Sequence, residues 1–410
     1  MEDNKLYNKS FVLENFSSIQ NLAGIGFFSF AFFLPLHTGT SNLFLIISLA
    51  AVLIGIFKGT TKGRLFPQRW KMLLFTPFMF FVLHLVGLSY SENPILGISY
   101  IERSLSFLLV PLILLFTTQN YILYLRKLLL KGLIVGSSVS LIILITVNSY
   151  DYFSTQKFFH IGTDLFDYYH TYLKFTQPLG QHPTYLGVYY LTAIVFMGEV
   201  LRNKYIKYII VALFGLGFLF LNSRIVFVVL LFLIIFFLGK ITKQMFLEKQ
   251  VLKLIALSAL FLIGIFTTIE VIAKSYIGSR IKNIYEFELS SQTEAKFNSH
   301  SKSNPRMARY LSAIKLIKNK PFLGYGTTGE RINLKQQFLK DGLDFAAEQN
   351  YNSHNQYLGF TVRYGVVGLG FFIFFFCSNF YLSWSRKENR YLFFVLLIAS
   401  VCLVENYFDR

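Results

Sequence analysis

Charged residues are scarce in this chain. Only 15% of its 410 residues are Asp, Glu, Lys or Arg, whereas soluble globular proteins carry about 25%. Hydrophobic residues make up 54% of the chain, and the mean hydropathy is +0.50. Because apolar runs also recur along the whole length, the composition excludes a cytosolic enzyme and predicts a membrane protein.

Cysteine and several catalytic signatures are also scarce or missing. The two cysteines, Cys377 and Cys402, stand in apolar runs, so no disulfide framework is expected. The sequence has no Asp-x-Asp, His-Glu-x-x-His, Gly-x-x-x-x-Gly-Lys-Ser/Thr or Gly-x-Ser-x-Gly. These absences argue against a metal-dependent glycosyltransferase, a zincin, an NTPase and a serine hydrolase. No metal site and no cofactor are therefore expected.

Long hydrophobic runs fill most of the chain. A membrane-spanning helix needs about 20 mostly apolar residues. This criterion predicts eleven spans, at 19–36, 41–57, 72–90, 101–117, 129–147, 183–200, 206–221, 224–239, 252–273, 355–382 and 390–406. The expected fold is an all-α, polytopic transmembrane bundle of 11–12 spans.

The basic residues predict the orientation of that bundle. If the N-terminus is inside, every second connection carries Lys or Arg, near 58–71, 126–131, 202–207, 240–249 and 386–390. Short basic loops stay in the cytoplasm, so the two long loops, 148–182 and 274–354, are expected outside. Much of the net charge of +18 is thereby explained as a topology signal. No zinc-finger, RNP or basic-helix pattern suggests nucleic acid as a partner.

This topology divides the chain into three parts. Residues 1–273 form a bundle of about nine spans, with the smaller outer loop near 148–182. Residues 274–354 are expected to form a large outer loop with interfacial amphipathic helices, and residues 355–410 to form the C-terminal spans. Any chemistry outside the bilayer is expected in the two outer loops.

The long loop contains a basic amphipathic pattern. Over 307–320 the apolar residues recur at helical spacing, at Met307, Tyr310, Leu311, Ile314 and Ile317. The preceding Pro305 and the following Pro321 mark its ends. Such a helix lies in the headgroup plane, although a structural lid on the bundle would show the same pattern. It leads into Gly324-Tyr-Gly326, which is either an ordinary turn or a place where backbone approaches a ligand.

Basic and imidazole side chains gather at the expected outer boundary. Arg224 stands in a turn between two apolar runs, where an arginine is costly unless it snorkels or meets an anion or a cavity. Arg306, His182 and His354 stand at the same boundary, and Arg103 lies in the fourth span. Two arginines can clamp a diphosphate leaving group. A histidine there can exchange a proton with a substrate, or simply contact a headgroup.

Eight stretches of sequence together resemble the landmarks of one enzyme family. They are Tyr90-Ser-Glu-Asn93, Ile101-Glu-Arg103-Ser-Leu105, Gln181-His-Pro-Thr-Tyr185, Asn222-Ser-Arg224, Asn304-Pro-Arg306-Met-Ala-Arg-Tyr310-Leu-Ser-Ala313, Lys320-Pro-Phe-Leu-Gly324-Tyr-Gly326, His354-Asn-Gln-Tyr-Leu358 and Tyr364-Gly-Val-Val-Gly368-Leu. In this combination the chain resembles the O-antigen ligase and O-antigen polymerase superfamily of bacterial inner-membrane proteins. The resemblance covers most of the chain from about Tyr90 onward. Members commonly have twelve spans, whereas eleven are counted here.

The resemblance implies a metal-independent, inverting glycosyltransferase of the GT-C type on the periplasmic face. In such proteins a glycan is transferred from undecaprenyl pyrophosphate to an acceptor hydroxyl. For an O-antigen ligase of lipopolysaccharide biosynthesis, the acceptor is lipid A–core. It implies that Arg224 and Arg306 bind the pyrophosphate and that His354 activates or positions the acceptor. Supporting roles are expected for His182, Arg103, Arg309, Asn355, Gly324 and Gly326.

Three other functions fit the sequence. An O-antigen or exopolysaccharide polymerase shares the motifs and differs in using the end of another glycan as acceptor. A protein O-oligosaccharyltransferase also differs only in its acceptor. A polysaccharide transporter or flippase would instead need charged residues near mid-span and, in matching halves, helices broken by Gly or Pro. The sequence shows neither feature clearly, and Glu102 and Arg103 are the nearest candidates for the charged residues.

Overall fold

The computed structural model describes residues 17–59, 71–154, 170–248, 250, 270, 295–297, 301–303 and 305–409. The predicted span at 252–273 lies outside the described residues, apart from residue 270. So do most of the predicted outer loop before residue 305 and the middle of the loop at 148–182.

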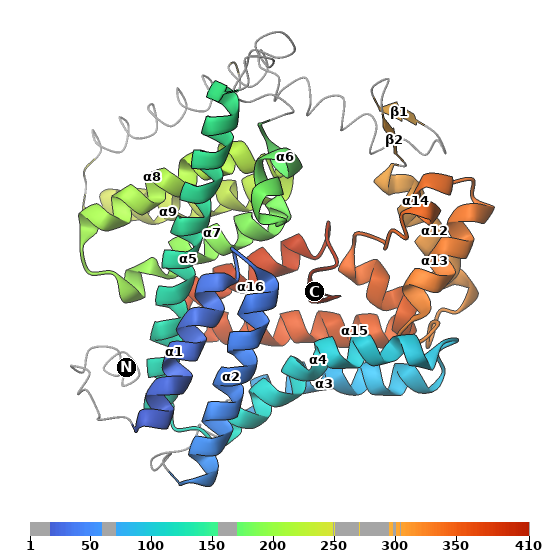
Figure 1. Ribbon diagram of the computed structural model, residues 1–410, viewed down its shortest axis with the longest axis horizontal. Coiled ribbons are helices and arrows are strands. Elements are labelled where there is room, and N and C mark those ends of the chain that lie inside the picture. The colour runs from blue at the N-terminus through green and yellow to red at the C-terminus, as the bar shows by residue number, and fades with distance from the viewer. Residues whose placement is uncertain are drawn as a thin grey trace.

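The described residues are almost entirely helical (Figure 1). The helices of the bundle are α1 (Ser18–Phe33), α2 (Thr38–Phe57), α3 (Lys71–Ser89), α4 (Pro94–Leu115), α5 (Gln119–Ser154), α6 (Tyr172–Thr176), α7 (Pro183–Val200), α8 (Lys204–Leu221), α9 (Arg224–Leu247), α15 (Gln356–Ser385) and α16 (Asn389–Val401). Between α9 and α15 lie α12 (Arg306–Asn319), α13 (Gly329–Lys340) and α14 (Asp344–Glu348). Two short antiparallel strands, β1 (Ala295–Phe297) and β2 (Ser301–Ser303), precede them.

The helices form packed groups that meet near the C-terminus. Helix α1 packs along α2 and α5, and α3 packs along α4 and α15. Helices α12, α13 and α14 stack together at one end of α15. In Figure 1 the C-terminus lies centrally between the bundle and this stack.

Every predicted span inside the described residues coincides with a helix. The span predicted at 183–200 has the same bounds as α7. Among the described residues, five helices are long and apolar enough to cross a bilayer, namely α2, α4, α5, α8 and α15, and several others are shorter and apolar. The predicted all-α, polytopic membrane fold is confirmed, while the count of eleven crossings stays a prediction.

Several helices begin or end five or more residues away from the predicted span bounds, including both ends of α5 and the C-terminal end of α9. Helix α4 begins at Pro94 and not at residue 101, because Asn93 accepts a hydrogen bond from the Leu96 amide (3.2 Å) and Pro94 suits the first turn. Helix α5 runs from Gln119, since nothing breaks it, so the basic connection near 126–131 lies within a helix. Helix α16 ends at Val401 and not at residue 406.

Helix α12 is present as predicted, but the face that it buries differs from the apolar stripe. Small residues meet the protein, with Ala308 and Ala313 buried. Leu311 and Ile314 of the predicted stripe are 42% and 38% exposed. Small side chains allow close helix packing, and Leu316 is buried beside them. Leu311 and Ile314 remain available to lipid, as an interfacial position requires. That position stays a prediction.

A break in α15 fixes the turn after α12 to the bundle. Gly365 has φ 62° and ψ −159°, so the helical hydrogen bonds stop there. The freed carbonyls of Val362 and Arg363 accept from the amides of Tyr325 (3.0 Å) and Gly326 (2.8 Å). A Cβ at Gly365 would lie 2.1 Å from the Phe322 carbonyl oxygen, which only glycine avoids.

The residues after α16 fold back into the bundle. The Gln356 amide donates to the Cys402 carbonyl (2.8 Å), and the Phe408 amide donates to Gln356 Oε1 (2.8 Å). The Phe408 ring packs among five other phenylalanines, which are Phe80, Phe107, Phe372, Phe375 and Phe376. This C-terminal tail, residues 402–409, carries Glu405 and Asp409 into the interior.

Candidate functional site

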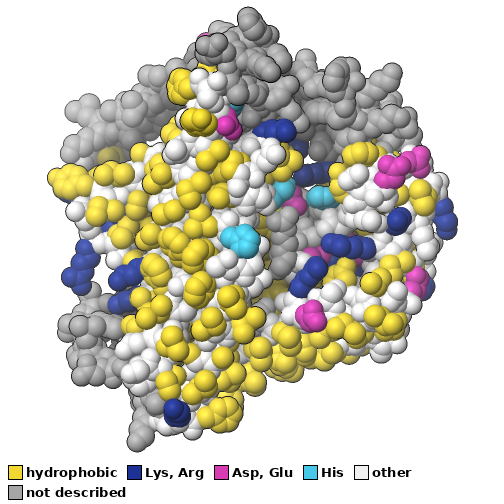
Figure 2. Space-filling model, viewed as in Figure 1, with side chains coloured by type: hydrophobic (Ala, Val, Ile, Leu, Met, Phe, Trp, Pro, Cys, Tyr) yellow, Lys and Arg dark blue, Asp and Glu magenta, His cyan; other side chains and the backbone are white. Residues whose placement is uncertain are grey.

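Three of the predicted site residues surround one carboxylate, that of Glu405. Its oxygens lie 3.5 Å from His354 Nδ1, 3.9 Å from an Arg306 guanidinium nitrogen and 3.9 Å from His182 Nε2. The Glu405 side chain is buried, whereas its three partners keep 19–27% of their side-chain surface exposed. Figure 2 shows basic, acidic and histidine side chains gathered around the hollow between α12–α14 and the bundle. We call these four residues the Glu405 cluster.

His354 is held in an uncommon backbone conformation just before α15. Its φ is +48°, and its amide donates to Asn352 Oδ1 (3.0 Å). The imidazole meets the Tyr351 ring edge-on at 5.6 Å. The next residue, Asn355, caps α15 by accepting from the Leu358 amide (3.1 Å). The ring is therefore placed by the turn that starts the helix.

Arg306 reaches the cluster from the first turn of α12. The preceding Pro305 begins this helix, as predicted. One turn later the Tyr310 hydroxyl donates to the backbone carbonyls of His354 and Leu403, both at 3.4 Å. Helix α12 thus contacts both the histidine turn and the tail that carries Glu405. Its Arg309 is buried and lies over the Tyr351 ring at 5.1 Å, behind the histidine.

His182 enters the cluster from the N-terminus of α7. Its Nδ1 accepts from the Thr184 amide at 3.4 Å and so caps the helix. An accepting Nδ1 leaves the proton on Nε2, which is the nitrogen nearer to Glu405. The cap therefore sets both the place and the tautomer of this imidazole.

Arg224 begins α9 close to the start of α7. The turn before it uses Asn222 at φ +43°, and the Ser223 hydroxyl lies 3.1 Å from the Thr184 hydroxyl. The helix start that carries Arg224 is therefore packed against the helix start that carries His182. The Arg224 side chain is exposed. Its pairing with Arg306 on a diphosphate stays a prediction.

The charges of the cluster act on Glu405. Burial by itself disfavours a carboxylate, but the contact with His354 and the charges of His182, His354 and Arg306 outweigh it, so the pKa of Glu405 is lowered. The cluster therefore places one guanidinium and two imidazoles around a buried, ionised carboxylate.

A second ionic network lies behind the cluster. Arg363 of α15 bonds Glu330 of α13 and Asp409 of the tail, with Arg363 Nε 2.9 Å from Glu330 Oε2 and Nη1 2.8 Å from Asp409 Oδ1. The side chains of Arg363 and Glu330 are 1% and 0% exposed. This buried network joins α13, α15 and the tail.

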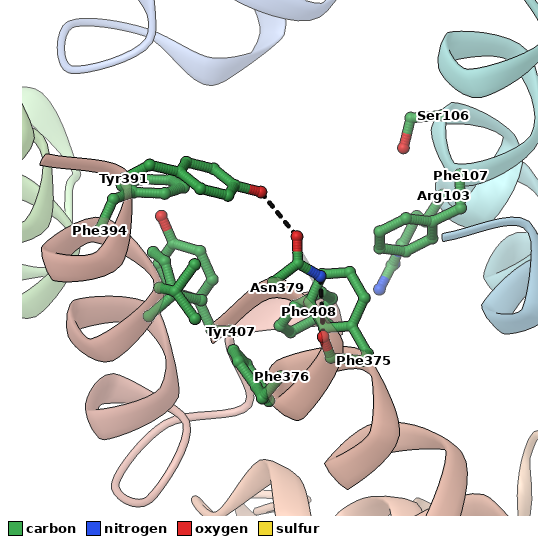
Figure 3. Close-up of a pocket in the computed structure, with 12 residues that line it drawn as sticks. Arg103, Ser106, Phe107, Phe375, Phe376, Asn379, Tyr391, Phe394, Tyr407 and Phe408 are labelled. Carbon is green, nitrogen blue, oxygen red and sulfur yellow. Dashed lines mark hydrogen bonds between the residues drawn. The ribbon is translucent and has the colours of Figure 1, made fainter. Parts of the chain in front are cut away.

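Arg103 lies beside the tail at the edge of a cavity. One of its guanidinium nitrogens donates to the Asp409 carbonyl at 3.3 Å. The cavity of about 280 Å³ is bounded by α4, α15 and α16 (Figure 3). Its lining is mainly aromatic, with one polar pair in which the Tyr391 hydroxyl donates to Asn379 Oδ1 (2.6 Å).

The Gly-x-Gly turn contacts backbone in this structure. A Cβ at Gly324 would lie 2.4 Å from the Val362 carbonyl oxygen, and one at Gly326 would lie 2.6 Å from the Gly87 carbonyl oxygen. Both glycines have positive φ, 64° and 83°. Close approach to α15 and α3 therefore accounts for them, and a contact with substrate stays a prediction.

Sequence reasoning missed four functional candidates, which are Glu405, Glu330, Arg363 and Asp409. A signal existed for Arg363 and Glu405, because both stand inside apolar runs that were taken as spans, where charged residues are rare and functional. For Glu330 no local pattern gives a signal. Its burial depends on contacts with residues 33 and 76 positions away.

These features define an all-α, multi-pass membrane protein with a cationic, histidine-bearing site beside a helical loop. In the part of the chain that the structure describes, no group of three or more His, Cys, Asp or Glu side chains is arranged to hold a metal ion. Residues 209–373 match the family model described as O-antigen ligase. The predicted resemblance to the O-antigen ligase and polymerase superfamily is thereby confirmed.

The match supports a glycosyltransferase-type enzyme with a glycan donor and an acceptor. The matched segment includes Arg224, Arg306 and His354, whereas His182 and Glu405 lie outside it. No curated protein matches the chain. The donor, the acceptor and the face of the membrane therefore belong to the proposal that follows.

Proposed function

We propose that this protein moves a glycan from undecaprenyl pyrophosphate to a hydroxyl of lipid A–core, as an O-antigen ligase on the periplasmic face of the bacterial inner membrane. One observation carries the proposal. Arg306 and His354 lie on the same carboxylate, within 4 Å of Glu405, inside a segment that matches an O-antigen ligase model. A cation for a leaving diphosphate and a base for an attacking hydroxyl are thus next to each other.

The reaction needs two charges handled at once. The acceptor oxygen attacks the anomeric carbon and its proton passes to His354 Nε2, while the bond from that carbon to the diphosphate oxygen breaks and its electron pair leaves with the lipid diphosphate. Attack opposite the leaving group inverts the anomeric centre. Arg306 and Arg224 neutralise the departing diphosphate by charge-assisted hydrogen bonds.

Glu405 has a distinct part in this scheme. Its carboxylate lies on the Nδ1 side of His354, so it stabilises the imidazolium that forms when Nε2 takes the proton. This is the arrangement by which a buried carboxylate supports a histidine base in other transferases and hydrolases. Arginine supplies the charge neutralisation, so the proposed reaction is metal-independent.

Purified protein in nanodiscs tests the proposal. It is mixed with a polyprenyl-pyrophosphate-linked glycan and lipid A–core, without ATP or added metal, and both released polyprenyl pyrophosphate and glycosylated acceptor are measured. Arg306→Ala and His354→Ala should each lose transfer, and Lys318→Ala, an exposed basic residue on the same helix as Arg306, should retain it. Transfer that survives both site substitutions would refute the proposed site.

The nature of the acceptor separates ligase from polymerase. In cells that lack their own copy, loss of all O-antigen rungs on a lipopolysaccharide gel indicates a ligase. A single-repeat band indicates an O-antigen or exopolysaccharide polymerase. Glycan on protein would indicate a protein O-oligosaccharyltransferase.

A transporter is the second candidate function, and one observation favours it. Helix α15 is broken at Gly365 next to the buried Arg363, as substrate sites of transporters often are. However, Arg363 already has two carboxylate partners, Glu330 and Asp409. Release of polyprenyl pyrophosphate by the purified protein would decide for transfer, and glycan movement without release would decide for transport.

A further inference from the structure

Glu330 lies at the start of α13, outside the Glu405 cluster, and is fully buried. Its Oε1 oxygen accepts three hydrogen bonds, from the Ser353 amide (3.1 Å), the Ser353 hydroxyl (2.8 Å) and the Asn406 side-chain amide (2.9 Å). One carboxylate oxygen therefore gathers donors from two segments that are far apart in the sequence.

Those two donors are the neighbours of the site residues. Ser353 immediately precedes His354, and Asn406 immediately follows Glu405. The His354 imidazole and the Glu405 carboxylate, 3.5 Å apart, therefore belong to two segments whose adjacent residues, Ser353 and Asn406, are both bonded to Glu330. A shift of either segment changes the distance between the imidazole and the carboxylate.

The other oxygen of Glu330 is fixed from behind. Oε2 accepts from Arg363 Nε at 2.9 Å, and Arg363 is itself bonded to Asp409. Gly359 leaves room for the carboxylate, because a Cβ there would lie 2.8 Å from Oε1. The position of Glu330 is therefore also set by contacts with α15, at Gly359 and Arg363.

We propose that Glu330 is a positioning residue that sets the contact between His354 and Glu405 by holding Ser353 and Asn406 on one oxygen. This inference rests on the proposed function for its catalytic consequence. Glu330 meets no reacting atom and acts only through the two residues next to the site. It also gives the helical loop a role in the chemistry besides covering the bundle.

The first measurement is hydrogen–deuterium exchange of the full-length protein in nanodiscs, which needs no activity. Glu330→Gln keeps the size of the side chain and removes its charge. Exchange in the peptides that cover 350–356 and 402–409 should rise at least about tenfold together, because charge-assisted hydrogen bonds to both are weakened. Exchange in α7 and α8 should not change.

The second measurement is the steady-state kinetics of glycan transfer. Glu330→Gln should lower kcat at least about tenfold, part of the factor of about 100 to 10,000 that a positioned base contributes. The KM for the donor should change less than about threefold, since loss of an interaction formed mainly in the transition state lowers kcat. A residue that only stabilises the fold would lower the yield of folded protein and leave kcat of the remainder unchanged.

Two further variants keep the test decisive. Ser353→Ala removes the 2.8 Å bond to Glu330 and keeps the backbone bond, so it should lower kcat by a smaller factor even if Glu330→Gln fails to fold. Combining it with Glu330→Gln should cost no more than Glu330→Gln alone, because both act through one contact. Glu199→Gln breaks the Arg126–Glu199 pair (2.8 Å) between α5 and α7 and is the matched control, with kcat unchanged.

The outcomes separate the two proposals. Faster exchange in both segments, 350–356 and 402–409, together with a lowered kcat supports the positioning role of Glu330. Unchanged exchange in both segments, or a kcat of Ser353→Ala and Glu330→Gln equal to that of Glu199→Gln, overturns it and leaves the proposed function intact. A wild-type protein that transfers no glycan refutes the proposed function, and the exchange result still decides whether Glu330 holds the two segments.

Discussion

Two buried carboxylates, Glu405 and Glu330, lie close to each other in the fold and are held in opposite ways. Glu405 faces three positively chargeable side chains at 3.5–3.9 Å, and those partners are partly exposed. Glu330 accepts well-formed hydrogen bonds from Ser353, Asn406 and Arg363, all of them buried. A carboxylate thus forms a loose ion cluster at Glu405, with contacts of 3.5–3.9 Å, and a saturated network at Glu330, where both oxygens accept hydrogen bonds of normal length.

The difference shows how the protein separates binding from stability. The contacts of 3.5–3.9 Å around Glu405 leave the partly exposed Arg306 able to bind another anion, as the proposed diphosphate requires. A saturated network inside the protein has no such capacity, and losing one partner strands an uncompensated charge. Substitutions in the two regions should therefore damage different properties.

The largest effect is expected in the buried network. Arg363→Ala leaves Glu330 and Asp409 buried without their shared cation, which should cost about 3–5 kcal/mol of stability. Thermal unfolding in detergent, followed by fluorescence-detected size exclusion, measures it. Arg306→Ala at the exposed cluster is the matched comparison and should change the midpoint little. Similar losses for both would remove the distinction between the regions.

The next effect is catalytic and belongs to the other carboxylate. Glu405→Gln should leave the protein folded and lower glycan transfer about 100-fold, because a neutral amide no longer stabilises a charged His354. Transfer assays at saturating donor measure it, with Glu199→Gln as the control for loss of a carboxylate elsewhere. A Glu405→Gln protein that unfolds but is fully active when folded would assign Glu405 to structure instead.

A smaller effect is expected in the dependence of stability on pH. The pKa of Glu405 is lowered in the folded protein from its usual 4.5, so its contribution is complete above about pH 4.5 and is lost as the pH falls through the lowered pKa. The midpoint of thermal unfolding should therefore fall less steeply on acidification in Glu405→Gln than in the wild type. Equal slopes would mean that the ions of the cluster do not stabilise one another.

The smallest effect is expected at the surface of the loop helices. The pKa of Asp341 is lowered because hydrogen bonds from Lys315, Ser312 and Gln337 outweigh its burial. Lys315 is 57% exposed, so solvent screens the pair. Asp341→Asn should lower the free energy of unfolding by about 1 kcal/mol or less. In the wild type the same contribution is lost as the pH falls through the lowered pKa of Asp341. The substitution should leave glycan transfer unchanged, because the contact between Lys315 and Asp341 only stabilises the packing of α12 against α13.

Much of the fold could be predicted because a bilayer allows few structures. Runs of apolar residues located α7 to the residue and located the other described spans to within several residues. The errors at α4 and α5 arose where a helix continues beyond its apolar run, which hydropathy does not detect. The break at Gly365 was also missed, since a glycine in an apolar run marks a kink only when a segment such as Pro321–Gly326 packs there.

The site was predicted in part. Arg306, His182 and His354 were chosen by residue type and boundary position, and the structure places all three around Glu405. Glu405 itself was taken as the end of a span, and Glu330 as an ordinary residue of the loop. Their roles depend on partners that the chain brings together from 23 to 223 residues away, between Glu330 and Ser353 and between Glu405 and His182, which no local pattern records.

The sequence by itself determined the membrane class, the helices and the residue types available for chemistry, because hydrophobic runs, proline and helix caps act over a few residues. Only the tertiary structure decided which charges meet. Ion pairing depends on distances of a few ångströms between segments far apart in the chain, and burial decides whether a pair is loose or saturated. That decision separates Glu405, beside the partly exposed Arg306, His182 and His354, from Glu330, which bonds the residues next to His354 and Glu405.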